Sequence, residues 1–148
     1  MSRSANHFFT GAGSGPANYI EDVFNIGLYT ATGGSETFSI LGNVDMYTKG
    51  GLVWSKSRNS ATGNYLIRPT LPGGGGIHNQ SNTTSGNDSF GTTEFKVNQN
   101  NTVTMANGSI NSGGSTYVSW NFAKQKKFFD VVTYNGDSTA GKTVAHNL

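Results

Sequence analysis

Hydrophobic and polar residues alternate with a period of two from Ile26 onward, which is the spacing of a strand with one face toward a core. Leu52, Trp54 and Lys56, for example, fall on one face of such a strand, and Val53 falls on the other. Clusters of glycine, asparagine and serine separate the alternating stretches, as turns do. The pattern predicts strands at residues 26–29, 37–41, 51–57, 65–68, 94–97, 102–105, 117–122 and 128–134.

The clearest hairpin joins the predicted strands 94–97 and 102–105. Phe95 and Val97 are expected to face Val103 and Met105 across a four-residue turn that contains three asparagines. Asparagine tolerates the left-handed backbone that such a turn requires. The spacing therefore predicts an antiparallel pair with one buried face.

Two stretches without periodicity, residues 71–76 and 78–88, are predicted to form one long surface loop. Roughly nine or ten short strands separated by turns are typical of a two-sheet sandwich. The predicted fold class is therefore all-β, an antiparallel β-sandwich of the jelly-roll or lectin-like kind.

The first 25 residues have a different character, because they are polar and glycine-rich and carry one apolar pair, Phe8 and Phe9. Glycine and proline within residues 11–16 oppose regular structure. Apolar residues recur at roughly helical spacing in residues 17–25, which allows a short helix there. We predict an extended N-terminal arm with at most that helix. The two phenylalanines either dock on another chain or fold onto their own domain, and both interpretations stay open.

Part of the C-terminal stretch repeats a pattern found near the front of the chain. Residues 22–29 and 129–134 are each a hydrophobic stretch that ends in tyrosine, and each is followed by a small-residue turn and a threonine-led stretch. Such a recurrence suggests a repeated module. The predicted organisation is an anchoring arm at 1–25, a β-sandwich module at 26–127, and the start of a second repeat or a connecting strand at 128–148.

Composition agrees with strands rather than helices, since only 12% of residues are charged and 21 are glycine. The formal charge is +2, and the single basic cluster, Lys124, Lys126 and Lys127, is too small to predict a nucleic-acid interface. The absence of cysteine excludes disulfides and thiolate metal sites. No apolar run approaches the ~20 residues of a membrane span, and no secretion signal is evident, so we expect synthesis in a cytoplasm without membrane insertion.

Residues 136–143 match the phosphate-binding pattern G-x-x-x-x-G-K-[ST], and a predicted strand precedes them. A phosphate-binding loop of this kind opens a helix, whose N-terminus contributes to binding. Only five residues follow Thr143, too few for that helix. The segment is therefore interpreted as a turn between two strands.

Other catalytic and metal-binding patterns are missing. The histidines His7, His78 and His146 lack metal-ligand spacing, and no G-x-S-x-G nucleophile motif occurs. We predict no catalytic residue, no metal, no cofactor and no enzymatic activity. Sequence alone does not exclude glycosidase-like carboxylate pairs; the candidates are Asp88 with Glu94 and Asp130 with Asp137.

Aromatic residues on the predicted strands raise the alternative of glycan binding, because exposed rings stack on sugars. Alternating aromatics usually form the core, and we expect Trp120 to lie there. Tyr65 stands beside the glycine-rich loop and is the candidate glycan contact, with a core position equally open.

Three C-terminal segments carry a resemblance: Y-V-S-W-N-F at 117–122, K-F-F-D-V-V-T-Y at 127–134 and A-G-K-T-V-A-H-N-L at 140–148. Together they resemble a module of tail-fibre-type virion proteins of marine phages, cyanophages among them. G-L-V-W-S-K-S-R-N at 51–59 and A-N-Y-I-E-D-V-F at 17–24 are similar to its front half. Residues 68–88 do not match, and such proteins usually continue beyond the H-N-L ending.

The resemblance implies a structural virion protein, the N-terminal part of a phage tail fibre, located in the virion after synthesis in the host cytoplasm. Expected partners are further copies of the chain, as a homotrimer, other tail proteins, and host surface glycans. The glycan-binding module remains the alternative function. The candidate virion interface comprises Phe8, Phe9, Tyr19, Ile20 and Phe24.

Overall fold

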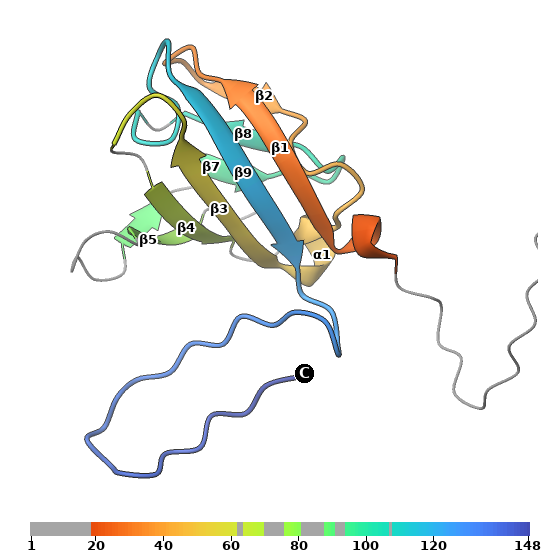
Figure 1. Ribbon diagram of the computed structural model, residues 1–148, viewed down its shortest axis with the longest axis vertical. Helices are drawn as coiled ribbons and strands as arrows, with labels where there is room; N and C mark the ends of the chain where they lie inside the picture. Colours follow the sequence, from red (N-terminus) through yellow and green to blue (C-terminus); the bar gives the residue numbers. More distant parts are fainter. Residues whose placement is uncertain (1–18, 62–63, 70–75, 81–87, 91–93, 107) are drawn as a thin grey trace, which may run out of the picture.

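The computed structural model describes residues 19–61, 64–69, 76–80, 88–90, 94–106 and 108–148. These residues form two antiparallel sheets with little helix, which confirms the predicted all-β sandwich (Figure 1). The large sheet has the order β1 (Phe24–Thr30), β9 (Thr116–Ala123), β3 (Gly51–Ser57), β4 (Asn64–Pro69), β5 (Gly76–Gln80) and β6 (Asp88–Phe90). The small sheet has the order β2 (Glu36–Phe38), β8 (Val103–Met105) and β7 (Phe95–Val97).

The hydrophobic core lies between the small sheet and the β3–β4 part of the large sheet. Val53 and Ile67 enter the core from the large sheet, and Phe95 enters it from the small sheet. All three side chains are fully buried. The predicted hairpin is confirmed, because Phe95 pairs with Met105 and Val97 with Val103. All four of these side chains are buried, as their alternation required.

One end of the core is closed by α1 (Met46–Lys49), a single helical turn whose Met46 is fully buried. The turn begins because the Asp45 carboxylate accepts a hydrogen bond from Thr48 N at 3.0 Å, and the Thr48 hydroxyl also donates to it. Partial burial pushes the pKa of Asp45 upward, but the Thr48 hydrogen bonds and the Lys49 charge outweigh it and lower the pKa.

The short helix allowed at residues 17–25 is η1 (Ile20–Asp22), a single 3₁₀ turn, and β1 begins at Phe24, which pairs with Phe122. Two other expectations about single elements were wrong. The strand expected at 37–41 is β2, displaced to Glu36–Phe38. The tract 78–88 is not all loop, since β5 and β6 add to the sheet through backbone pairing with β4.

The expected strand at 128–134 does not form. Among the described residues, this stretch has one isolated bridge, between Gln125 and Phe129, and no strand partner. In Figure 1 the dark-blue segment leaves the end of β9, runs beyond the sandwich and folds back on itself. Val132 is 41% and Tyr134 67% exposed, so the segment lacks the neighbouring strand that would turn its apolar alternation into a buried face.

Strands β1, β9 and β3 have an unusual distribution of side chains between the inner and the outer face of the sheet. The inner face carries three large core side chains, Tyr29, Val53 and Tyr117, and its remaining buried positions are polar or small, with Ser55, Ser119 and Asn121 fully buried. The outer face carries the large apolar side chains, in three rows across the strands: Phe24–Phe122–Leu52, Ile26–Trp120–Trp54 and Leu28–Val118–Lys56. The expectation that Trp120 lies in the core was therefore wrong; its ring lies outside, 5.1 Å from that of Trp54.

Close packing explains why this inner face has small residues. The side-chain amides of Asn25 and Asn121 both donate to the carbonyl of Ile40, at 2.7 and 2.8 Å. A Cβ on Gly27 would lie 2.5 Å from the Ile40 Cβ, well inside contact distance. The connection through Ile40 thus lies directly against β1 and β9, where large side chains have no room.

Candidate functional site

The two ends of the sandwich have different roles. At one end the chain enters and leaves: Phe24 pairs with Phe122, and Ala123 N donates to Val23 O at 2.9 Å. At the other end the loops gather, because Arg58 N donates to Thr116 O and Ala31 N to Ser115 O. The loop end therefore lies one sheet length away from the entering and leaving chain (Figure 1).

The loop end contains a pocket of about 220 Å³. Its wall is rich in hydroxyl groups and carries no formally charged side chain. Strands β3, β4 and β9 supply one side, and the 108–115 loop supplies the other. The lining residues are Ser57, Ser60, Tyr65, Gly108, Ser109, Ser112, Ser115 and Tyr117.

Tyr117 anchors the pocket to the core. It is 2% exposed, its ring stacks on that of Tyr29 at 5.0 Å, and its hydroxyl accepts from Ser112 N at 3.3 Å. The Tyr29 hydroxyl donates to Ile110 O at 2.8 Å and lies 2.9 Å from the Ser55 hydroxyl. The 108–115 loop is therefore held by two tyrosines of the large sheet.

Burial raises the pKa of Tyr29. The hydrogen bond with Ser55 opposes this effect, and the neighbouring Tyr117 adds to it. Tyr29 is thus a neutral donor across the ordinary pH range, which is what a structural hydrogen bond to a backbone carbonyl requires.

Asn59 organises the rim of the pocket. Its side-chain oxygen accepts from Thr116 N at 3.1 Å and from the Ser57 hydroxyl at 3.2 Å, and its amide nitrogen is 3.5 Å from Gly114 O. One asparagine therefore joins the end of β3, the start of β9 and the 108–115 loop. The rim is positioned by hydrogen bonds rather than by apolar packing.

Tyr65, the candidate glycan contact, does line this pocket, but it is only 7% exposed. Its ring meets His78 edge-on at 5.4 Å. Tyr65 therefore forms part of the pocket wall and does not offer an open ring face for stacking. The pocket is better suited to hydrogen bonding with a small neutral ligand, since its volume is below the roughly 300–1,000 Å³ of clefts for drug-sized ligands.

Sequence reasoning did not find the pocket serines. They come from separate loops, and each looks like ordinary turn composition. A signal was present in the run S-I-N-S-G-G-S at residues 109–115, which places three of the lining serines within seven residues. Their convergence with Ser57 and Ser60 depends on the pairing of β3 with β9.

The structure describes three of the five candidate virion-interface residues. Phe8 and Phe9 lie outside the described residues. Tyr19 and Ile20 are 54% and 55% exposed at η1, where the chain enters the sandwich. Phe24 instead belongs to β1, and its ring contacts that of Phe122 at 4.8 Å on the outer face of the sheet.

The segment that matches the phosphate-binding pattern is a turn outside the sandwich. The Lys142 ammonium pairs with the Asp137 carboxylate at 3.0 Å and donates to Asn135 O. Asp137 also accepts from Thr139 N at 3.0 Å. Hydrogen bonds from Lys142 and Thr139 lower the pKa of Asp137. No helix follows within the described residues up to 148, which supports the interpretation as a turn, but the strands expected on either side of this turn do not form.

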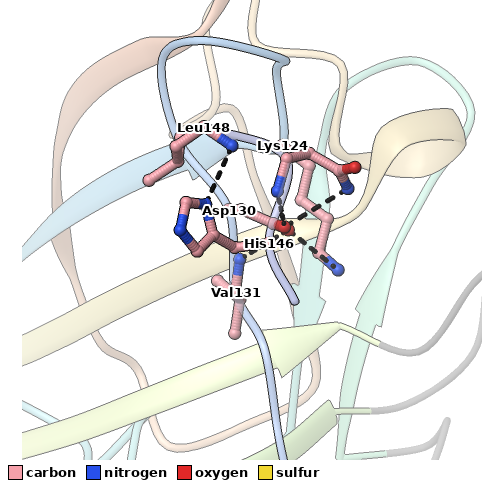
Figure 2. Close-up of polar contacts among 6 residues, drawn as sticks. Lys124, Asp130, Val131, His146 and Leu148 are labelled. Carbon is pink, nitrogen blue, oxygen red and sulfur yellow. Dashed lines mark hydrogen bonds and ion pairs between the residues drawn. The ribbon is translucent and has the colours of Figure 1, made fainter. Parts of the chain in front are cut away.

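Asp130 joins the beginning and the end of the C-terminal segment, residues 124–148 (Figure 2). Its carboxylate accepts from Val131 N at 2.9 Å and from Asn147 N at 3.1 Å, and it lies 3.5 Å from the Lys124 ammonium. Desolvation acts to raise the pKa of Asp130, but the Asn147 hydrogen bond and the Lys124 charge outweigh it and lower the pKa. Asp130 and Asp137 thus each form an ion pair with a different lysine, Lys124 and Lys142.

The part of the chain that the structure describes contains no group of three or more histidine, aspartate or glutamate side chains placed to hold a metal ion. In the same residues, no helix has the length and apolar character to cross a membrane. Comparisons with known protein families, with curated proteins and with solved structures each gave no match.

Proposed function

We propose that this protein is a structural component of a phage particle, the N-terminal part of a tail fibre that attaches the fibre and supports host recognition. The observation that carries the proposal is the difference between the two ends of the sandwich. Both chain connections emerge at one end, next to the exposed Tyr19 and Ile20, and the opposite end presents loops and a pocket. This arrangement suits a module held at its base and displayed at its tip.

The C-terminal segment fits the same role. Residues 129–134 repeat the pattern of residues 24–29 in β1, with a phenylalanine first and a tyrosine last, yet they have no strand partner among the described residues. A strand-like segment with exposed Val132 and Tyr134 is what the start of a second module, or a strand donated to a neighbour, requires. The fibre root would then consist of this sandwich, as a homotrimer, and the parts that follow it.

Immunogold electron microscopy of intact and disrupted particles tests this role, with one antibody raised against residues 1–24 and another against residues 108–116. We expect the second antibody to label intact particles where the fibres join the tail. The first should label only disrupted particles, because the arm is covered by its partner. Particles that neither antibody labels, before or after disruption, would overturn the proposal.

The pocket favours a second candidate function, recognition of a host-surface glycan. Hydroxyl groups from Ser57, Ser112 and Ser115 and an uncharged wall match the hydrogen-bonding groups of a neutral sugar. The volume of about 220 Å³ limits the ligand to one sugar unit or part of one. Display of the pocket at the loop end agrees with a recognition role.

Binding to an array of host-derived polysaccharides tests this second function. The informative variant is Ser112→Phe, which fills the pocket from an exposed loop position, whereas Tyr65→Ala would remove a buried ring and disturb folding. The matched control is Ser35→Phe, at an exposed position outside the pocket. Binding that Ser112→Phe abolishes and Ser35→Phe preserves supports the function, and an array without binding contradicts it.

A further inference from the structure

The outer apolar face of the sheet is defined by Phe24, Ile26, Leu28, Leu52, Trp54, Val118, Trp120 and Phe122. These eight side chains fill eight of the nine positions where β1, β9 and β3 meet in register. The inner face of the same strands has only three large core side chains, Tyr29, Val53 and Tyr117, among polar or small ones. A sheet with one solvated face normally shows the opposite distribution, with its apolar side chains toward its own core.

The outer apolar face is exposed in the single chain. Ile26 is 54%, Leu28 63% and Trp54 36% exposed. Since a large apolar side chain presents about 150–250 Å² when fully exposed, these three contribute roughly 300 Å². Monomeric proteins rarely expose more contiguous apolar surface than a few hundred Å² unless it is a binding site.

The face continues onto the C-terminal segment. The ring of Phe129 stacks on that of Phe122 at 4.9 Å, at the end of β9. The remainder of that segment runs beyond the end of the sheet (Figure 1) and leaves Ile26 and Leu28 open. The segment therefore enlarges the face of its own chain without covering it.

Charge and area both point to a second copy as the occupant. Eight of the nine positions are apolar, and the ninth, Lys56, lies at a corner with its ammonium 3.2 Å from Ser57 O. Two such faces can thus meet without burying an unpaired charge at their centre. Its five half-buried members add to this area, and standard protein interfaces begin at about 600 Å² for each partner.

We propose that the outer apolar face is the surface through which copies of this chain associate, sheet against sheet around a symmetry axis. Trp54 and Trp120 lie at its centre, where buried aromatic residues contribute most to binding. The homotrimer of the proposed fibre root needs such a surface, and in that respect the inference rests on the proposed function. The association itself is measurable in solution without particles.

Tryptophan fluorescence reports this face selectively, because the chain has two tryptophans and both belong to it. The full chain is diluted from about 100 μM to 0.1 μM, a range that spans the micromolar Kd of weak interfaces. Emission maximum, acrylamide quenching and mass by light scattering are followed together. We expect a mass of two or three chains at high concentration, and on dilution a red shift with at least twofold stronger quenching.

The double variant Ile26→Lys/Leu28→Lys tests the surface itself. Both positions are more than half exposed, so the lysines are tolerated by the single chain. The matched control, Ser35→Lys/Ser39→Lys, adds the same charge at exposed positions outside the face. We expect the first variant to be monomeric with unchanged circular dichroism, and the control to associate like the wild type.

A wild type that stays monomeric at every concentration overturns the proposal. Protected tryptophans in that monomer would indicate cover by residues 1–18 of the same chain, and accessible tryptophans would indicate a different partner. Association that survives in the Ile26→Lys/Leu28→Lys variant also overturns it. The result of the particle-labelling experiment does not depend on these measurements. A chain that associates in solution but does not label particles would contradict the virion role alone, and a chain that labels particles but stays monomeric would contradict the association surface alone.

Discussion

Gly27 lies where β1 passes closest to the connection that carries Ile40. The Cβ of any other residue would be 2.5 Å from the Ile40 Cβ, 2.7 Å from its carbonyl oxygen and 2.8 Å from the Ser119 hydroxyl. Two of these neighbours are backbone or Cβ atoms and cannot rotate away. The position therefore excludes side chains through packing rather than through backbone conformation.

Gly27→Ala is expected to destabilise the protein by about 1–3 kcal/mol, because the extra methyl group overpacks the interior. Urea denaturation at 25 °C measures the change. The control is Gly136→Ala, where a Cβ meets nothing within 4 Å, and its effect should stay within about 0.5 kcal/mol. Equal effects of the two substitutions would show that the close approach at Gly27 is not present.

Tyr29→Phe is expected to cost about 1–3 kcal/mol, because it leaves the buried Ile110 carbonyl without the Tyr29 donor and takes a partner from Ser55. The same denaturation measurement applies, with Tyr134→Phe, at a residue that is 67% exposed, as the control. A Tyr29→Phe protein as stable as the wild type would mean that water replaces the hydroxyl.

At the residue scale, sequence reasoning found which side chains share a face, but not which face lies inside. Period-two alternation places Trp120 and Asn121 on opposite faces of β9, whichever of the two faces is buried. Hydrophobicity favours the tryptophan as the inner residue, yet Asn121 is fully buried and donates to Ile40 O. The choice depends on the connection through Ile40, which leaves room for small and polar groups only.

At the scale of elements, the C-terminal segment depends on one carboxylate. Asp130 joins Val131, Asn147 and Lys124, and thereby brings the two ends of the segment together. Its lowered native pKa means that the ionised form favours the closed segment. This contribution is complete above the ordinary aspartate value of about 4, and it is lost as the pH falls through the lowered native pKa.

Acidification is therefore expected to open the segment while the sandwich persists. The amide resonances of Val131 and Asn147 should shift together with one midpoint below about pH 4. Asp130→Asn removes the titrating group and should abolish that transition. A midpoint above the ordinary aspartate value would contradict the described hydrogen bonds.

Elements were predictable where their partner was local in sequence. The 95–97 and 103–105 hairpin pairs across a short turn, so alternation and turn residues were sufficient. β5 and β6 were missed because they are polar and join the sheet through backbone pairing with β4. The 128–134 strand was expected from the same alternation, but no neighbouring strand is available to it within the described residues.

At the scale of the whole molecule, the sandwich ends at Ala123, before the C-terminal segment begins. The buried core cluster contains no residue after Ala123. The chain after Ala123 is connected to the sandwich through the Phe122–Phe129 ring contact, the hydrogen bond from Lys124 N to Gly50 O and the one between Lys49 and Gln125. The two parts should therefore unfold independently.

A chain truncated after Lys127 is expected to keep a single cooperative thermal transition with a Tm within a few degrees of the full chain, since 1 kcal/mol corresponds to roughly 2–8 °C at this size. Circular dichroism at a concentration where both chains have the same oligomeric state measures it. A matched truncation after Asn111 removes β9 from the middle of the β1–β9–β3 pairing and should abolish folding. A large loss of Tm in the first truncation would place residues 128–148 in the folding unit.

The sequence by itself determined the fold class and most strand positions, because period-two alternation and turn residues are local properties of the chain. The tertiary structure decided which face of β1, β9 and β3 lies outside, where the serine pocket forms and why residues 128–134 form no strand. These features depend on the approach of the Ile40 connection, on the register of β3 with β9 and on the availability of a neighbouring strand. Each is a contact between residues far apart in sequence, and alternation along one strand does not encode such contacts.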